Sequence, residues 1–415
     1  MAHLLVIELP GGNDGDILTA ALLRGDRFSF LVANLAHYQK QPALQDVLCR
    51  ADGLIELDLD DHTAVDDAVK TAHGIDRFDA VLCLLDIRLM DAARIATLLC
   101  LPHIKPDVAF LLRDKFSVRQ KLSHHLIKQP NFRLALSNED LKKAVQDIGL
   151  PVLIKPSDGF GSQNIAVLRD ETDLAPWLSP LEDMLPSRAD YGLGVKANDR
   201  LLVESYMEGQ FIGCDFISAN GQHSMVGLNE KVMFAPPSFA IKGGCFSPYD
   251  ETMAPLRDYA AHCLDAVGFD WGASHIEIML TREGPRLVEI NGRLVGARIP
   301  RLMSYALGYS VHEQLITLLL SRALPLHSVN TRRVAVSRWL TTSREGILDQ
   351  IRLPTVQDPA ISEVSLFKTH GDYVCPPYEN AHRLGYVMVT APTAGEANAI
   401  ADAYIEQCEV VLTEK

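Results

Sequence analysis

One stretch around residue 280 limits the possible folds more than any other part of this 415-residue chain. Residues 275–280 (HIEIML) and 286–291 (RLVEIN) alternate polar and apolar side chains on either side of a short turn that contains Gly284. An alternation with a period of two is typical of β-strands, and a short glycine-containing connection between two such runs predicts an antiparallel hairpin. We therefore expect antiparallel sheet in the second half of the chain.

The hairpin also predicts where polar groups gather. Residues two apart in a strand share a face, so Glu289 and Asn291 point the same way, with Val288 turned to the core. Pairing through the turn would bring Glu277, which stands with His275 on the partner strand, beside Glu289. Two carboxylates and one amide oxygen form a hard, all-oxygen ligand set that suits Mg²⁺ or Mn²⁺ bridging phosphates. The alternative is a solvated amphipathic hairpin, which is the commoner use of this pattern.

A lysine and a glycine-rich loop form a second motif. A buried run ends at Lys155, and the loop that follows contains Gly159, Gly161 and Ser162. Glycines let consecutive backbone N–H groups point inward as a nest for phosphate oxygens, and the ammonium offsets the remaining charge. The loop lacks the Gly-Lys-Ser/Thr of a Walker A motif. The alternative is an ordinary glycine-rich hairpin with an edge lysine.

Two weaker signals flank these motifs. An apolar strand from residue 201 runs into Glu204 and then Tyr206, so Glu204 or nearby backbone groups would read the exocyclic amine of an adenine. Arg293 follows the hairpin and would stabilise charge developing on a transferring phosphoryl or tetrahedral centre. The alternatives are a plain strand-to-turn junction and a surface arginine paired with one of the acids.

Composition narrows the class of protein. The net charge of −14 disfavours binding to nucleic acid or to anionic lipid. The eight cysteines form no CxxC pair, which argues against a zinc ribbon and suits a reducing cytoplasm. No apolar stretch approaches the ~18 residues of a transmembrane helix, and the N-terminus lacks the basic start of a signal peptide. We therefore expect a cytoplasmic protein that acts on small molecules, with a homodimer as the working expectation for its assembly.

The first hundred residues predict a mostly parallel sheet. Strand-like stretches (4–9, 28–34, 80–85) alternate with helix-like ones (17–23, 89–100), which is typical of βαβ units. The loop after the first strand does not spell GxGxxG, which weakens the interpretation as a NAD-dependent dehydrogenase.

Helix boundaries can be predicted further along the chain. A helix is expected from Arg113, and a second over 138–148 between a capping box at Ser137 and a stop at Gly149. Residues 151–298 read as antiparallel strands. Further helices are expected after Ser310, and after Thr393 at the end of a C-terminal module of short strands.

In this order, the motifs resemble those of the ATP-grasp superfamily over roughly residues 80–320. The residues that carry the resemblance are Arg113-Asp114-Lys115 with Arg119, Pro-x-x-x-Lys155-Pro, Val203-Glu204-Ser-Tyr-Met-Glu-Gly209, and His275-x-Glu277 leading to Glu289-Ile-Asn291. Within the superfamily, two further segments resemble the L-amino-acid α-ligase branch of the bacilysin-synthetase type: Asn291–Pro300, and Glu230-Lys231 with Pro236-Pro237. That branch joins two unprotected amino acids into a dipeptide, commonly in peptide-antibiotic pathways, and includes a ligase associated with tabtoxin.

The resemblance implies an α/β (α+β) ATP-grasp fold with an N-terminal Rossmann-like parallel-sheet domain and a C-terminal α/β module. The expected domains are 1–112, the Rossmann-like domain; 113–200, the first grasp subdomain with the phosphate lid loop; and 201–415, the second subdomain with the Mg²⁺ site and the C-terminal module. The implied reaction phosphorylates one amino acid with ATP, and the amine of a second then displaces phosphate.

The resemblance also implies roles for single residues. ATP would be held by Lys115, Lys155, Gly159, Gly161, Ser162, Glu204, Tyr206 and Met207. Two Mg²⁺ ions would be bound by Glu277, Glu289 and Asn291. Arg293 would touch the transferred phosphate and the acyl-phosphate intermediate, and Glu230, Gly296 and Ala297 would face the amino-acid substrates.

The sequence departs from the family pattern at several positions. Many relatives carry a ribose-binding glutamate where this chain has Phe211, and a Gly-His element where it has Ile241-Lys-Gly-Gly-Cys245. Ala297 replaces a residue that is bulky in some relatives, which would enlarge the pocket for the second amino acid. Two rivals stay open: an ATP-grasp ligase for another acid, of the purine-pathway or biotin-carboxylase kind, and a non-catalytic nucleotide-binding module.

Overall fold

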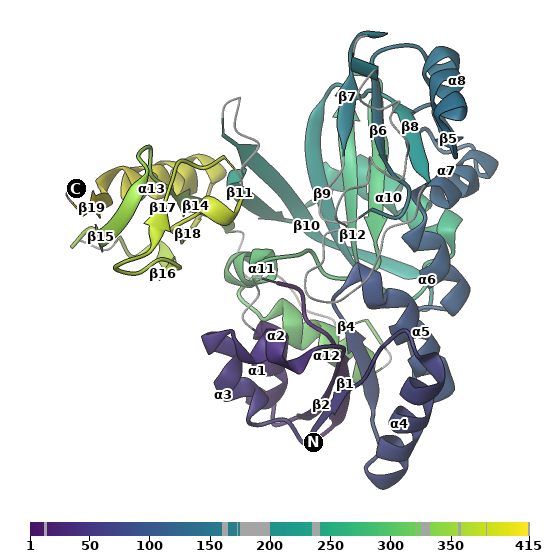
Figure 1. Ribbon diagram of the computed structural model, residues 1–415, viewed down its shortest axis with the longest axis horizontal. Coiled ribbons are helices and arrows are strands. Elements are labelled where there is room, and N and C mark those ends of the chain that lie inside the picture. Colours follow the sequence, from purple (N-terminus) through teal and green to yellow (C-terminus); the bar gives the residue numbers. More distant parts are fainter. Residues whose placement is uncertain are drawn as a thin grey trace.

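The computed structural model describes residues 1–11, 15–159, 165–171, 173–174, 200–234, 241–321, 323–324, 333–355, 358–378 and 380–413. In Figure 1 the N-terminal part lies at the bottom, a pair of sheets with their helices stands above it, and the C-terminal module projects to one side. Because the glycine-rich loop continues into residues 160–164, Gly161 and Ser162 lie outside the described residues, as do Pro236 and Pro237.

The N-terminal part is a parallel four-stranded sheet in the order β3-β2-β1-β4. Its strands are β1 (His3–Ile7), β2 (Arg27–Val32), β3 (Gly53–Glu56) and β4 (Ala80–Cys83). Its helices are α1 (Asp16–Leu23), α2 (Leu35–Gln39), α3 (Pro42–Leu48), α4 (His62–Ile75), the 3-10 turn η1 (Asp86–Arg88) and α5 (Leu89–Leu98). Leu4 and Val6 enter one core and Leu5 and Ile7 another, because a parallel sheet is buried on both faces. The predicted βαβ units are confirmed. The edge strand β3, which is only half-buried, was not predicted.

A second, antiparallel sheet has the order β5-β8-β6-β7. This part contains α6 (Pro106–Arg113), α7 (Lys115–His124), β5 (Phe132–Ala135), α8 (Asn138–Ile148), β6 (Val152–Pro156), β7 (Ala166–Leu168) and β8 (Leu201–Ser205). The cap of α8 is confirmed, since Ser137 Oγ accepts from the Asp140 N–H at 3.1 Å and Gly149 ends the helix with a φ of 82°. The helix expected from Arg113 begins instead at Lys115, because Asp114 is extended and its side chain caps α7.

The largest sheet has eight strands in the order β13-β12-β9-β10-β11-β14-β18-β16. The strands are β9 (Gln210–Ala219), β10 (Gln222–Met233), β11 (Ile241–Pro248), β12 (Gly272–Thr281), β13 (Gly284–Asn291), β14 (Val334–Leu340), β16 (Ile361–Leu366) and β18 (Gly385–Ala391). The expectation of strands throughout 151–298 is wrong at η3 (Glu251–Met253) and α10 (Ala254–Val267), a helix that ends at Gly268 in a left-handed conformation.

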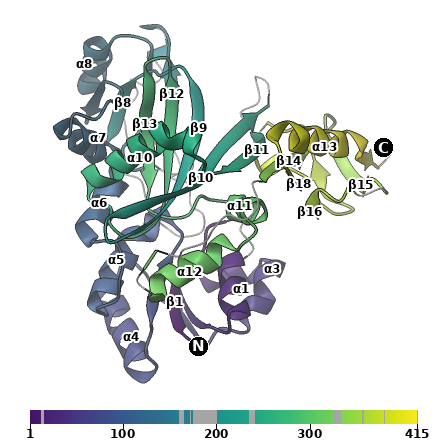
Figure 2. The same cartoon turned by 180° about the vertical axis from the view of Figure 1, so that it is seen from behind.

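The C-terminal module extends this sheet through the pairing of β11 with β14, and Figure 2 shows it from behind. The module adds β15 (Gly346–Arg352), β17 (Tyr373–Val374), η4 (Asn380–His382), α13 (Ala394–Gln407) and β19 (Glu409–Leu412). Helix α11 (Ile299–Leu307) packs against β11 and β14, and the next helix, α12 (Val311–Ser321), packs against α11 and against α1 of the N-terminal part. The predicted caps are confirmed: Ser310 Oγ accepts from Glu313 N–H and Thr393 Oγ1 from Glu396 N–H, each at 3.2 Å.

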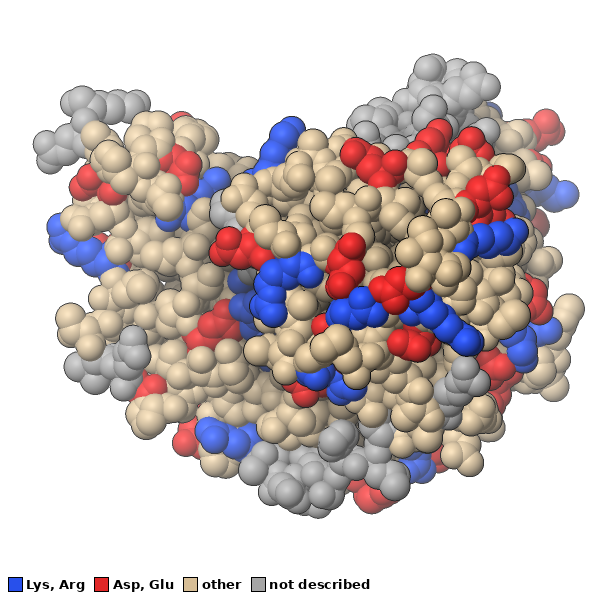
Figure 3. Space-filling model, turned by 90° about the horizontal axis from the view of Figure 1, so that it is seen from below, with Lys and Arg blue, Asp and Glu red and all other residues tan. Residues whose placement is uncertain are grey.

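Basic and acidic side chains are interspersed over the face seen in Figure 3. Among the residues that the structure describes, no helix is long and apolar enough to cross a membrane. The predicted domain boundaries stay predictions. The strand β8, which begins at the predicted boundary after residue 200, pairs with β5 and β6 of the antiparallel four-stranded sheet.

Candidate active site

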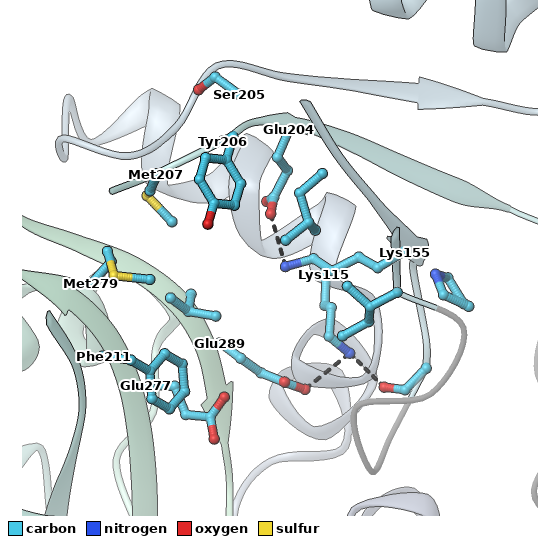
Figure 4. Close-up of a pocket in the computed structure, with 15 residues that line it drawn as sticks. Lys115, Lys155, Glu204, Ser205, Tyr206, Met207, Phe211, Glu277, Met279 and Glu289 are labelled. Atoms are coloured by element: carbon cyan, nitrogen blue, oxygen red, sulfur yellow. Dashed lines mark hydrogen bonds and ion pairs between the residues drawn. The ribbon is translucent and has the colours of Figure 1, made fainter. Parts of the chain in front are cut away.

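A cleft of about 210 Å³ lies between the antiparallel sheet β5-β8-β6-β7 and the β9–β12–β13 part of the large sheet. Eight of the predicted residues line it: Lys115, Lys155, Gly159, Glu204, Tyr206, Met207, Glu277 and Glu289. All of them except Gly159 are labelled in Figure 4. Residues from separate motifs of the sequence are thus brought to one cavity.

One part of the cleft wall is apolar. It is formed by Leu153, Ile165, Tyr206, Met207, Phe211, Met279 and Val288. Val288 was expected in the core; it lines the cleft because the register of β13 against β12 shifts at this point. The Tyr206 N–H donates to the carbonyl of Pro151 at 3.0 Å, whereas the Met207 N–H makes no hydrogen bond to another described residue. An apolar slot with a spare backbone donor suits a flat heteroaromatic base.

Glu204 is buried between two cations. Its Oε1 accepts from Arg119 Nε at 2.5 Å, and its Oε2 lies 2.8 Å from Lys155 Nζ. Burial alone would raise the pKa of Glu204, but these two charges and their hydrogen bonds lower it to about 2. Each carboxylate oxygen is therefore already engaged. Glu204 holds Lys155 at the cleft. Arg119 was noted in the sequence, but its contact with Glu204 was not predicted.

Lys115 connects the acidic hairpin with the glycine turn. Its Nζ lies 2.9 Å from Glu289 Oε1 and 2.5 Å from the carbonyl oxygen of Gly159. Its backbone N–H donates to Ser157 at 2.8 Å, which fixes the start of α7 against the turn. The carboxylate of Glu289 therefore faces the turn after residue 156 and does not point to bulk water.

The hairpin has the predicted pairing. Glu277 lies opposite Glu289, and His275 lies opposite Asn291. The side chains of Glu277 and Glu289 are 18% and 24% exposed. Burial would raise the pKa of Glu277, but Lys231, whose Nζ is 3.2 Å from its Oε1, and His275 lower it. Both acids are thus accessible to the cleft, and Glu277 is held ionised.

This donor set fits a magnesium ion. The Asn291 amide nitrogen donates to the His275 carbonyl at 3.5 Å, so the amide oxygen is the atom suited to a cation. Two carboxylates and an amide oxygen are hard donors of the kind Mg²⁺ prefers. The described residues contain no group of three or more His, Cys, Asp or Glu side chains arranged to hold a metal by themselves. An ion held by these residues would need further oxygen ligands, such as waters or substrate phosphates, as is usual for Mg²⁺ sites.

A buried pair behind Glu277 was not predicted. His275 Nδ1 lies 3.0 Å from Asp215 Oδ1, and its Nε2 lies 3.7 Å from Glu277 Oε1. Asn229 donates from its side chain to the other oxygen of Asp215. Burial lowers the pKa of His275, but Asp215 and Glu277 raise it to about 9. Gly213 makes room for the ring, because a Cβ there would stand 2.3 Å from His275 Cε1.

Of the predicted residues that the structure describes, five are not among those that line the cleft: Asn291, Arg293, Gly296, Ala297 and Glu230. Arg293 Nε donates to Asp86 Oδ2 at 2.6 Å, so its partner comes from the N-terminal part and is not a hairpin acid. Gly296 and Ala297 lie in the connection from β13 to α11. Glu230 neighbours Lys231 on β10 and so faces away from Glu277, where it accepts from the Gln210 side chain.

Comparison with known proteins gives two family matches. A family described as ATP-grasp domain matches residues 148–301, and one described as L-amino acid ligase C-terminal domain 2 matches residues 338–413. The crystal structure of an L-amino acid ligase from Bacillus licheniformis superposes with a TM-score of 0.80 at 17% identity, covering 100% of this chain and 99% of that one. The expected ATP-grasp fold is confirmed.

Two relatives are similar in sequence. An L-arginine-specific L-amino acid ligase of Bacillus subtilis is 24% identical over 273 residues, which is 65% of this chain and 64% of that protein. An uncharacterised protein of Sinorhizobium fredii is 28% identical over 319 residues, 74% of this chain and 63% of that protein. The chain thus spans less than two thirds of the length of these curated relatives.

Proposed function

The chain belongs to the ATP-grasp superfamily, and we propose that it is an ATP-dependent ligase that joins two unprotected L-amino acids into a dipeptide. The observation that carries the proposal is the register of the hairpin, which sets Glu277 opposite Glu289 beside an apolar cleft that also contains Lys115 and Lys155. The C-terminal match to L-amino acid ligases supports amino acids as the substrates.

ATP would lie with its base in the apolar slot and its phosphates toward Lys115 and Lys155. We propose that Glu277, Glu289 and Asn291 hold two Mg²⁺ ions, which neutralise phosphate charge when bound. Lys115 Nζ lies 2.9 Å from Glu289 Oε1. When Mg²⁺ binds to the Glu289 carboxylate in its place, the ammonium of Lys115 would be free to contact a phosphate. Gly159, with Gly161 and Ser162 beyond it, would cover the phosphates.

The reaction proceeds through an acyl phosphate. A carboxylate oxygen of the first amino acid attacks the terminal phosphorus of ATP, and ADP leaves. The amine of the second amino acid then attacks the acyl carbon, phosphate leaves with the bonding electron pair, and the amine loses a proton. Arg293 would stabilise the negative charge on the transferred group, while closure over the cleft would exclude water from the acyl phosphate. Gly296, Ala297 and Glu230 are proposed to face the amino acids.

The test is phosphate release from ATP and Mg²⁺ with a panel of amino-acid pairs, bicarbonate or no acceptor, followed by mass spectrometry of the products. We expect phosphate release that depends on an amino-acid pair, together with a product whose mass equals that pair minus water. ADP formation with bicarbonate alone would assign the chain to a carboxylating ligase. ATP binding without phosphate release for every pair would make it a nucleotide-binding module. The homodimer, the cytoplasmic location and the peptide-antibiotic context stay predictions.

A further inference from the structure

The segment that follows the acidic hairpin is anchored at both ends by distant parts of the chain. We call residues 292–298 the substrate loop, because it connects β13 to α11 and carries Arg293, Gly296 and Ala297. At its start, Arg293 is bound by Asp86 of the N-terminal part. At its end, Arg298 is bound by the C-terminal module. The loop is therefore held by residues far from it in the sequence.

The second anchor is an arginine in an aromatic socket. The Arg298 residue is 9% exposed, and its guanidinium lies over the rings of Phe367 and Tyr386, 5.0 Å from each ring centroid. Its Nη1 donates to the Tyr386 hydroxyl at 2.7 Å, and that hydroxyl in turn donates to Glu363. A planar guanidinium uses stacking and hydrogen bonding together in a way that lysine does not. The module thus holds Arg298 through several contacts, and the same hydroxyl and carboxylate also accept from Arg301 of α11.

The residue before the anchor is held in an unfavourable conformation. Ala297 has a φ of 54°, in the left-handed region that costs a residue with a Cβ roughly 1 kcal/mol. Arg298 itself ends the loop at the start of α11, where its carbonyl accepts from the N–H groups of Arg301 and Leu302, each at 3.1 Å. A strained backbone conformation persists only where surrounding contacts hold it in place. Here the contacts of Arg298 with Phe367 and Tyr386 hold the conformation of Ala297.

We propose that the C-terminal module positions the amino-acid site: the Phe367–Tyr386 socket fixes Arg298 and so sets the conformation of the substrate loop. The proposal rests on the proposed function, in which Gly296 and Ala297 face the amino acids. The proposed nucleotide contacts lie on α7, β6 and β8 and on β9, β12 and β13, and within the eight-stranded sheet β10, β11 and β14 separate β9 from β18 of the module. Loss of the socket must therefore act on the amino acids and leave ATP unaffected. Tyr386 and Arg298 are positioning residues in this scheme and do not touch the reacting atoms.

The experiment compares Tyr386→Phe with wild type by measuring KM for the amino acids and for ATP separately. We expect the KM for at least one amino acid to rise about tenfold, the effect of losing one charge-assisted hydrogen bond, while the KM for ATP changes less than about twofold. Asp402→Asn is the matched control, because Asp402 pairs with Arg338 of the same module at 2.8 Å without contacting the loop. Equal amino-acid KM values in the two variants, or parallel increases in both KM values for Tyr386→Phe, would overturn the proposal.

Two further measurements separate this proposal from the ligase assignment. Hydrogen exchange of the amides in residues 292–298 needs no catalysis; it should accelerate in Tyr386→Phe and stay at the wild-type rate in Asp402→Asn. Unchanged exchange in Tyr386→Phe refutes the socket even if the chain proves to have another activity. In the double variant Arg298→Lys/Tyr386→Phe, the increase in exchange rate should be clearly less than the sum of the two single increases, because both substitutions disrupt the Arg298–Tyr386 hydrogen bond. Additive increases would count against the socket.

Discussion

The acidic hairpin and the substrate loop are consecutive in the chain, yet the hairpin is stabilised by contacts between residues close in sequence and the loop by contacts with residues far away in sequence. Glu277 meets Glu289 through one tight turn, and the alternation of side chains fixes which face they share. Arg293, in contrast, meets Asp86 across 207 positions, and Arg298 meets Tyr386 across 88. The end of the site that we propose to bind metal is therefore encoded locally, whereas the geometry of the end that we propose to face the amino acids depends on how three parts of the molecule assemble.

The largest effect is expected from a substitution in the acidic hairpin, the locally encoded end of the site. Glu289→Ala removes one of the two facing carboxylates and leaves Lys115 without its ion-pair partner. We expect phosphate release to fall on the order of a thousandfold, the upper range for removing one electrostatic contact to a developing charge. The change is measured as amino-acid-dependent phosphate release, with circular dichroism to show that the fold is intact.

Glu283→Ala is the control for this variant. Glu283 lies in the turn of the same hairpin, is exposed, and pairs with Arg286 at 2.9 Å. It should keep wild-type turnover. Retained turnover in Glu289→Ala, or an equal loss in both variants, would contradict the metal assignment and remove the contrast between the two ends.

Local patterns predicted a large part of the fold. The caps at Ser137, Ser310 and Thr393 and the hairpin register depend on residues close in sequence, and all are present. The helix α10 was not predicted, although Leu256, Ala260, Cys263, Leu264 and Val267 follow its helical period and are buried. Strands lie on both sides of this segment, but the local helical period was sufficient to identify α10.

Partnerships between distant residues could not be predicted. Arg119 and Glu204 are 85 positions apart, and nothing in either segment specifies the other. The same holds for Asp86 and Arg293. Asp86 follows β4 and Arg293 follows β13, and these two strands belong to different sheets. An isolated charge reveals that a partner is needed, but burial and tertiary packing decide which partner it receives. Sequence reasoning therefore named the residues of the cleft better than the contacts among them.

The second prediction concerns the buried Glu204 and uses pH. The pKa of Glu204 is lowered from 4.5 to about 2, so its ion pairs stabilise the fold above its unfolded pKa and lose that contribution as pH falls through the folded value. A shift of this size corresponds to about 3 kcal/mol. The unfolding free energy of the wild type should therefore drop steeply below about pH 4.5. Glu204→Gln should flatten that drop, as measured by denaturant unfolding across the acidic range.

Glu208→Gln provides the comparison for this measurement. Glu208 is exposed and lies four residues further along the chain, so its replacement should leave the acidic drop as in wild type. An identical pH dependence in both variants would mean that the buried cluster does not contribute ionised pairs. The region around Glu204 would then owe its stability to packing alone.

A smaller effect is expected at the start of the substrate loop. Asp86→Asn keeps a hydrogen-bonding group but removes the charge that holds Arg293, which is also attracted by Glu289 and Glu277. The guanidinium should turn toward those acids, and kcat should fall about tenfold, the cost of one charge-assisted contact. The control is Asp66→Asn, which disrupts the pair with Arg94 inside the N-terminal part. If kcat is the same in both variants, the long-range anchor does not matter for catalysis.

The smallest effect tests whether the loop is strained. Ala297→Gly removes the Cβ that makes a φ of 54° unfavourable, and this gain is partly offset by the greater freedom of glycine in the unfolded chain. We expect the melting temperature to rise by about 1 °C. Ala399→Gly, the same substitution at an exposed position inside α13, should lower it, because glycine costs about 1 kcal/mol in a helix interior. A higher melting temperature for Ala297→Gly and a lower one for Ala399→Gly would show that the assembled molecule, and not the local sequence, imposes the conformation of Ala297.

A lower melting temperature in both variants would mean that Ala297 is not held in the left-handed conformation. The distinction between a locally encoded and an externally anchored end of the site would then lose its basis.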